Sequence, residues 1–212
     1  MQHLASSDPD RLVQATIRAN FKPEALHHDV EAHLDALQRC HTPECHVLAA
    51  GSPCQSFAPE GNRRGLKDPR GQVTLRILEL RDKLEPRLVL LEHSPGMRKT
   101  NNGKDWRKIR KLLTKGGLYR VYEKVLNTCD HGVPQNRSRL YIVLIHREDD
   151  RGTFVWPEAI PQPSIEDFLD PATAEDDATR VPPPSQRQRR AALETFKEKL
   201  ERPLEDACIL CL

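Results

Sequence analysis

The stretch VLAAGSPCQSF, residues 47–57, joins a short apolar run to a loop that carries Cys54. The apolar run predicts a buried strand, and the glycine and proline that follow it predict a stiff loop. Ligands of open α/β sheets bind outside the carboxyl ends of the strands, so this loop would hold Cys54 where a nucleophile meets a substrate. A buried, unreactive thiol is the alternative interpretation.

Further buried strands are predicted by three aliphatic runs, at residues 88–91, 121–126 and 140–145. Apolar residues spaced by four, three and four predict a helix over about residues 72–83, which Pro86 would end. The apolar stripe at residues 106–113 predicts a second helix, with a stop at Gly116 and Gly117. Strands that alternate with helices in this way are typical of an α/β layered sheet.

Composition limits the class of protein. The chain has 212 residues and a formal net charge of only +2, so its overall charge does not indicate a nucleic-acid partner. No apolar run approaches the roughly 18 residues of a membrane span, and the first ten residues lack the apolar stretch of a signal peptide. We therefore expect a protein that is not secreted and not membrane-bound: nuclear if its source is a eukaryote, otherwise cytoplasmic.

Cysteine usage and proline content add two expectations. The chain has six cysteines but no secretory signal, and the cysteines lack the paired spacing of a zinc site, so we expect reduced thiols and no metal.

Several prolines interrupt a polar stretch after about residue 150. We predict a main domain over residues 1–150, a Pro-rich wrap or linker over 151–185, and a helical tail over 186–212 with a helix at 186–200.

A carboxyl group and two guanidinium groups accompany Cys54. Glu92 directly follows the run 88–91, and if that strand is a parallel neighbour of the first, its carboxyl can meet the same substrate ring as the thiol. Alternation along an extended segment puts Gln135, Arg137 and Arg139 on one face, which suits a phosphate or a polar base edge. A surface Glu92 and a solvated edge strand are the alternatives.

A basic cluster lies within fourteen residues in which Asp105 is the only acidic side chain. Such a cluster would give a duplex-binding protein salt-dependent affinity for DNA, or it would form the solvated outer face of a helix. The basic residues are Arg98, Lys99, Lys104, Arg107, Lys108, Arg110 and Lys111.

Together these elements resemble the cytosine-5 DNA methyltransferase family over about residues 8–170. The Pro53-Cys54-Gln55 sequence resembles the nucleophile motif of that family, and Glu92 with its neighbours resembles its Glu-Asn-Val motif, with His93 in place of the Asn. Residues 135–139, QNRSR, match its Gln-x-Arg-x-Arg motif. Residues 28–30, HDV, look like the segment whose Asp touches the cofactor adenine.

The resemblance implies a Rossmann-like methyltransferase sheet, mostly parallel with an antiparallel terminal hairpin, and S-adenosylmethionine as the cofactor. It implies double-stranded DNA as the substrate, with a flipped cytosine that Cys54 attacks at carbon 6 while a protonated Glu92 holds ring nitrogen 3. The catalytic residues implied are Cys54, Glu92, Arg137 and Arg139. The cofactor-binding residues implied are Asp29, Val30, Ser52 and Pro53, and the substrate-binding residues are Gln55, Ser56 and Gln135.

The chain departs from the family pattern in two places. Its first glycine is Gly51, so no residues here correspond to the family's glycine-rich turn, and nothing after Asp170 resembles a target recognition domain. We therefore expect an N-terminally incomplete chain. Three functions stay open: methylation of cytosine in DNA, methylation of cytosine in RNA, and a catalytically impaired fragment that binds nucleic acid or a partner protein. The sequence predicts neither the oligomeric state nor the recognised DNA site.

Overall fold

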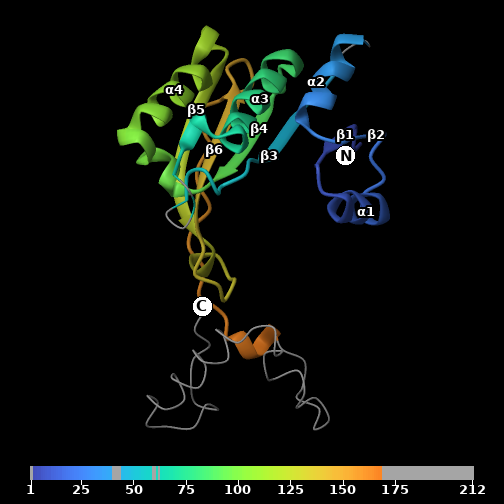
Figure 1. The fold of residues 1–212 in the computed structure, drawn as a ribbon. Helices are drawn as coiled ribbons and strands as arrows, with labels where there is room; N and C mark the ends of the chain where they lie inside the picture. Colours follow the sequence, from blue (N-terminus) through green and yellow to red (C-terminus); the bar gives the residue numbers. More distant parts are fainter. Residues whose placement is uncertain (1, 40–43, 59–60, 62, 169–212) are drawn as a thin grey trace, which may run out of the picture. The chain divides into compact units, whose positions relative to one another are not determined.

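The computed structural model describes residues 2–39, 44–58, 61 and 63–168 (Figure 1). The chain divides into two compact units, each described by itself below. The first comprises Met1–Asn127 and Arg137–Glu158, and the second comprises Thr128–Asn136 and Ala159–Leu212. All of the site residues predicted from the sequence belong to the first unit except Gln135, which belongs to the second.

A four-stranded mixed sheet forms the centre of the first unit. Its strands run in the order β3 (Val47–Gly51), β4 (Leu88–His93), β6 (Ser138–His146), β5 (Tyr119–Asn127). Strands β3 and β4 are parallel, and β6 is antiparallel to both of its neighbours. The predicted strands and the predicted antiparallel terminal hairpin are therefore confirmed. This sheet is mixed rather than mostly parallel, because only one of its three strand pairs is parallel.

Two helices, α3 (Pro69–Leu84) and α4 (Lys104–Leu113), pack against the sheet (Figure 1). Both were predicted, and α3 begins earlier than expected because the side chain of Asp68 caps it and Pro69 fits its first turn. Ile77 and Leu78 of α3 join Ile109 and Leu113 of α4 in one core cluster with the buried residues of β4 and β6. Short 3-10 turns connect these elements: η1 (Gly65–Lys67), η2 (Pro95–Arg98), η3 (Thr100–Gly103) and η4 (Lys115–Gly117).

The N-terminal part of the first unit was not resolved into elements by the sequence analysis. It contains β1 (Ala5–Ser7), α1 (Arg11–Asn20), β2 (Ala25–His27) and α2 (Val30–Arg39). Strands β1 and β2 pair in parallel as a separate two-stranded sheet. They escaped prediction because each strand has only three residues, none of them fully buried, and α1 buries none of its residues.

The second unit contains η5 (Thr128–Asp130) and η6 (Ile165–Phe168) among its described residues. A parallel bridge between His131 and Ile160 joins its two chain segments. The predicted helix at 186–200 lies outside the described residues, and the predicted boundaries near 150 and 185 stay predictions. Within the described part of the chain, no helix combines the length and the apolar character that crossing a membrane requires.

Candidate active site

Cys54 lies on the loop that leaves the carboxyl end of β3, as predicted. Gly51, the last residue of β3, pairs in register with Glu92 of the parallel strand β4, so the two candidate residues leave the same edge of the sheet. The backbone oxygen of Cys54 accepts hydrogen bonds from the amides of Phe57 and Ala58, at 2.9 and 2.8 Å, which fold the loop into a tight turn. The thiol is half-buried, with Sγ 3.6 Å from the backbone oxygen of Ser52.

Close packing fixes this loop from two sides. The hydroxyl of Thr74 on α3 donates to Ser52 Oγ at 3.1 Å, and both residues are buried. On the other side, a β-carbon added to Gly96 would lie only 2.2 Å from the backbone oxygen of Phe57, so no larger residue fits without displacing the loop. The loop is thus positioned by α3 and by the chain that follows β4.

Glu92 meets Arg139 across the sheet. Arg139 lies on β6, the neighbour of β4, and its Nε is 2.7 Å from Glu92 Oε1 in an ion pair whose two side chains are 20% and 30% exposed. The other carboxylate oxygen, Oε2, would lie 3.4 Å from a β-carbon on Gly51. One oxygen of Glu92 is therefore held by Arg139, and the other faces the strand that delivers Cys54.

The three other predicted catalytic residues all affect the pKa of Cys54. Burial raises the pKa of the Cys54 thiol above its usual value, and the nearby negative charge of Glu92 raises it further. A hydrogen bond from the Ser94 backbone and the positive charges of Arg139 and Arg137 oppose this rise in pKa. Four groups predicted from three motifs thus act on one site. Because the pKa of Cys54 is raised, the sulfur is predominantly a thiol at neutral pH in the free chain.

The remaining predicted residues on the Cys54 loop differ in exposure. Gln55 is exposed, Pro53 is half-buried, and Ser52 is buried and occupied by its hydrogen bond with Thr74. Ser56 is fully buried, and its Oγ has no hydrogen-bond partner among the described residues.

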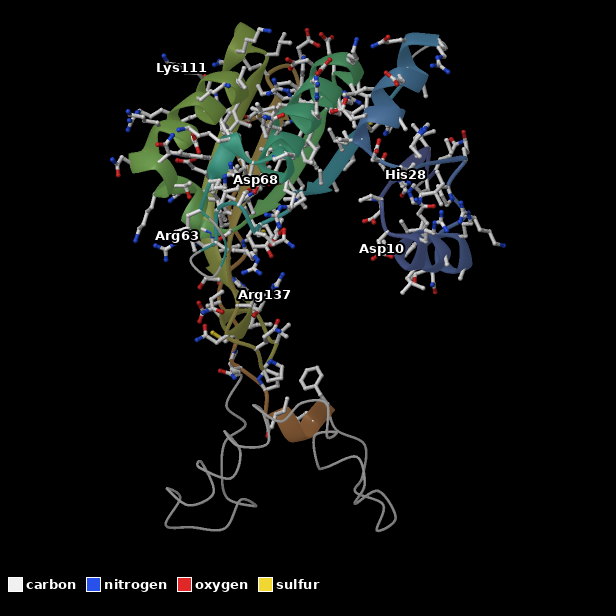
Figure 2. All side chains as sticks on the ribbon, viewed as in Figure 1. Asp10, His28, Arg63, Asp68, Lys111 and Arg137 are labelled. Atoms are coloured by element: carbon white, nitrogen blue, oxygen red, sulfur yellow. The ribbon has the colours of Figure 1, made fainter. Side chains whose placement is uncertain are left out.

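Arg137 is exposed and directly precedes β6, where its amide donates to Asn127 Oδ1 at 2.9 Å (Figure 2).

Gln135, the third predicted substrate-binding residue, belongs to the second unit. It is exposed, its amide donates to the backbone oxygen of Val133 at 2.7 Å, and its own backbone oxygen accepts from the hydroxyl of Thr128. These contacts shape the turn before β6. The role of its side chain stays a prediction.

The two predicted adenine-site residues begin α2. Asp29 caps the helix, since its Oδ1 accepts from the amide of Ala32 at 2.8 Å, and Val30 is half-buried against the core cluster. Close by, the rings of His27 and His33 stack with centroids 4.3 Å apart, and burial lowers the pKa of His33 to about 4, with a further contribution from His27. Asp29 therefore stands at the carboxyl end of β2, as Cys54 stands at that of β3.

His93, which the sequence marks only as a departure from the Glu-Asn-Val motif, is a buried residue of the site with a contact that the sequence did not predict. His93 is 2% exposed, and its ring meets Phe57 of the Cys54 loop edge to face, with centroids 4.7 Å apart. Burial lowers the pKa of His93 to about 4, so the ring is neutral at pH 7. The substitution of His for the family's Asn thus adds an aromatic contact between the end of β4 and the loop of the nucleophile. Only the deviation from the Glu-Asn-Val pattern could have signalled it.

No group of three or more His, Cys, Asp or Glu residues among the described residues has the geometry to hold a metal ion. The predicted catalytic residues contribute a thiol, a carboxyl and two guanidinium groups. A nucleophile beside an acid suits covalent catalysis on an electron-poor ring.

Comparison with known proteins connects this geometry with one family. The family model for C-5 cytosine-specific DNA methylases matches residues 1–202. Type II methyltransferase M.NgoBI of Neisseria gonorrhoeae is 33% identical over 157 residues, which are 74% of this chain and 47% of the relative. Type II methyltransferase M.HpaII of Haemophilus parainfluenzae is 32% identical over 166 residues, which are 78% of this chain and 45% of the relative.

Solved structures agree on the fold. The methyltransferase EhMeth of Entamoeba histolytica superposes with a TM-score of 0.60 at 19% identity, over 81% of this chain and 52% of that chain. The Dnmt2 methyltransferase of S. pombe superposes with a TM-score of 0.57 at 19% identity, over 93% of this chain and 58% of that chain. The Rossmann-like methyltransferase fold is therefore confirmed. The chain spans about half the length of the curated relatives that it matches.

Proposed function

Because this chain belongs to the C-5 cytosine-specific DNA methylase family, we propose that it methylates carbon 5 of cytosine in duplex DNA. The observation that carries the proposal is the meeting of Cys54, Glu92 and Arg139 at one edge of the sheet. A cytosine in a stacked duplex cannot reach a half-buried thiol, so the base would have to be flipped out of the helix.

In the proposed reaction, Cys54 supplies the electron pair. The thiol first gives its proton to solvent, and the thiolate sulfur then bonds to carbon 6 of the ring. Glu92 is a carboxylate paired with Arg139 in the free chain, and in the proposal it takes up a proton from solvent when the base binds. It donates this proton to nitrogen 3 as the ring electrons shift there, so carbon 5 becomes nucleophilic. When carbon 5 has taken up a methyl group, it loses its own proton to solvent, and the electron pair of that bond restores the double bond between carbons 5 and 6. The bond from Cys54 to carbon 6 breaks, and the sulfur leaves as the thiolate. The proton on nitrogen 3 then returns to Glu92.

Arg139 and Arg137 would serve this reaction through charge. Arg139 holds one oxygen of Glu92 and leaves the other free for the ring, so we assign it the positioning of the acid. Arg137 is exposed and still acts electrostatically on Cys54, which suits a contact with the phosphate of the flipped nucleotide. Both positive charges favour the thiolate over the thiol.

S-Adenosylmethionine would supply the methyl group when bound. The fit of the residues to this cofactor is partial. The parallel strands β1 and β2 end beside Asp8 and Asp29, and carboxylates at such strand ends suit the hydroxyl groups of a nucleoside. Pro53 and Ser52, next to Cys54, would face the methyl-bearing end. Residues 1–50 contain no glycine, so they offer no bare backbone for the close approach of the methionine end.

Transfer of labelled methyl groups tests this function. The chain is incubated with tritiated S-adenosylmethionine and either a cytosine-containing duplex or the same duplex with 5-methylcytosine at every cytosine. We expect incorporation into the first duplex alone, and none with the Cys54→Ala variant. Preferential incorporation into transfer RNA would instead support the RNA alternative. No transfer to DNA or transfer RNA, together with no heat of S-adenosylmethionine binding in calorimetry, would support the impaired fragment.

A further inference from the structure

The outer surface of α4 carries an unusual concentration of positive charge. Five of its ten residues are exposed cations, namely Lys104, Arg107, Lys108, Arg110 and Lys111. The inner surface of the helix is formed by Asp105, Ile109 and Leu113, all buried and spaced by four. Lys111 projects outward from α4 in Figure 2. We refer to these five side chains as the α4 basic face.

No acidic side chain among the described residues neutralises the α4 basic face, since none of its five cations forms an ion pair there. The only acid on the helix, Asp105, is turned inward, where its Oδ2 accepts from the amide of Leu66 at 3.1 Å. Arg98, which precedes the helix, is different: it pairs with Glu123 at 3.6 Å and lies over the ring of Trp106. Arg98 therefore does not belong to the face.

The neighbouring helix α3 shows what an ordinary charged surface looks like in this protein. Arg76 pairs with both Glu31 and Glu79, and Arg70 pairs with Asp68. On α4, by contrast, Lys104 and Lys108 are four residues apart, as are Arg107 and Lys111, and like charges at this spacing destabilise a helix. Lys104 also stands in the first turn, where the helix dipole disfavours a cation. An anion bound along this surface of α4 would relieve that repulsion.

The α4 basic face begins next to the proposed active site. Asp105 fixes the start of α4 to Leu66, and the amide of the preceding residue, Gly65, donates to the backbone oxygen of Ser56 at 2.9 Å. Ser56 belongs to the loop of Cys54. Two intervening hydrogen bonds therefore connect the nucleophile loop with the helix, and the charged surface extends from this junction along the helix axis.

We propose that the α4 basic face binds the phosphate backbone of the DNA duplex that flanks the flipped cytosine. The inference rests on the proposed function, which supplies duplex DNA as the partner. From Lys104 to Lys111 the helix rises about 10 Å, at roughly 1.5 Å per residue. Duplex DNA carries one negative charge per about 1.7 Å of its axis, so several phosphates lie within such a span. The contact gives affinity without reading sequence, because phosphates carry no base information.

The salt dependence of DNA binding tests the proposal. Each phosphate contact that a protein makes contributes about 0.9 to the slope of log affinity against log salt. The parent is a Cys54→Ala chain, in which covalent chemistry cannot contribute. Its affinity for a fluorescein-labelled duplex two helical turns long is measured by anisotropy over a range of salt, without cofactor. The test variant adds Lys104→Gln, Lys108→Gln and Lys111→Gln.

A matched control removes the same charge elsewhere, with Lys83→Gln, Lys124→Gln and Arg147→Gln, all exposed and outside α4. We expect the test variant to lower the magnitude of the slope by about 2 to 3, and the control to change it by less than 1. A third variant with Lys→Arg at the three α4 positions should restore the parent slope. Because the test variant removes repulsion within α4, its unfolding midpoint should equal or exceed that of the parent.

Three outcomes would overturn the proposal. The first is an equal loss of slope in the test variant and the control, which would mean that net charge alone matters. The second is an unchanged slope in the test variant. The third is preferential binding of a folded RNA over the duplex through the same three lysines. Because methyl transfer is not measured, failure here is distinct from failure of the proposed function, which Cys54 trapping on DNA tests separately.

Discussion

Two pairs of parallel strands differ sharply in how firmly they hold the residues at their ends. Strand β4, which delivers Glu92, buries Val89 at 0% and Leu91 at 7% exposure. Strand β3, which delivers Cys54, has no fully buried residue, but its Leu48 and Ala50 pack against the same core. Strands β1 and β2 have no fully buried residue, and α1, the helix between them, has none either. The catalytic half of the site, with Cys54 and Glu92, is thus preorganised by packing. The half assigned to the cofactor, beside β1 and β2, is lightly packed. Preorganised groups lower a reaction barrier most, whereas a lightly packed region gains most from ligand binding.

The largest effect is expected from Glu92→Gln in the preorganised half. This change keeps the shape of the side chain but replaces the carboxyl group that would donate a proton to nitrogen 3. One positioned acid typically contributes about 100-fold to 10,000-fold to a rate. Methyl transfer to a cytosine duplex measures the loss. Glu79→Gln on α3, which breaks only a surface ion pair with Arg76, is the matched control and should leave the rate unchanged. A Glu92→Gln rate near that of the parent would remove Glu92 from its role.

The next effect is expected where backbone contact fixes the Cys54 loop. Gly96→Ala would place a methyl group 2.2 Å from the backbone oxygen of Phe57, so the loop must move. A displacement of about 1 Å can cost about 100-fold in rate, and we expect kcat to fall by up to that amount. Gly116→Ala is the control: its φ of +74° strains the backbone, yet it lies in η4, remote from the loop. Equal losses of kcat in the two variants would contradict this account of the loop.

Lowering the pH should destabilise the lightly packed region around β1, β2 and His33. The pKa of His33 is about 4 in the folded chain and 6.5 in its ordinary state, so unfolding takes up a proton between these values. The contribution of His33 to the free energy of unfolding therefore falls as the pH drops from 6.5 toward 4, by about 2 kcal/mol at pH 5 relative to pH 7. Hydrogen exchange at pH 5, with rates corrected for the intrinsic effect of pH, should show the amides of β1 and β2 losing protection. His33→Gln should remove most of that pH dependence. An unchanged profile in this variant would exclude His33 as its cause.

A smaller effect is expected at the proposed cofactor site. Asp29→Asn keeps the cap on α2, because Asn caps helices as well as Asp does, and removes only the negative charge. We expect affinity for S-adenosylmethionine, measured by calorimetry, to fall about tenfold while the unfolding midpoint stays the same. Asp35→Asn, an exposed residue farther along α2, serves as the control. The assignment of Asp29 would be wrong if both variants bound the cofactor equally well.

The same contrast explains what the sequence could predict. Apolar runs and helical spacing were sufficient for β3 to β6, α3 and α4. Each of β4, β6, α3 and α4 buries several residues, and the aliphatic residues of β3 and β5 pack against the same core. The pairing of Cys54 with Glu92 followed from the rule that parallel strands end at one edge. The three-residue strands β1 and β2 carry no such signal. Contacts such as Thr74 with Ser52, or His93 with Phe57, depend on packing between segments that no local pattern links.

Covalent trapping tests the central claim, that Cys54 attacks a cytosine ring held by Glu92. The chain is incubated with S-adenosylmethionine and a duplex that carries 5-fluorocytosine, whose fluorine cannot leave as the carbon 5 proton does. We predict a protein–DNA adduct stable to denaturation, mapped to Cys54 by peptide mass spectrometry, and no adduct with Cys54→Ala. An adduct at Cys45 or Cys129, or equal adduct formation by the parent and Cys54→Ala, would contradict the account.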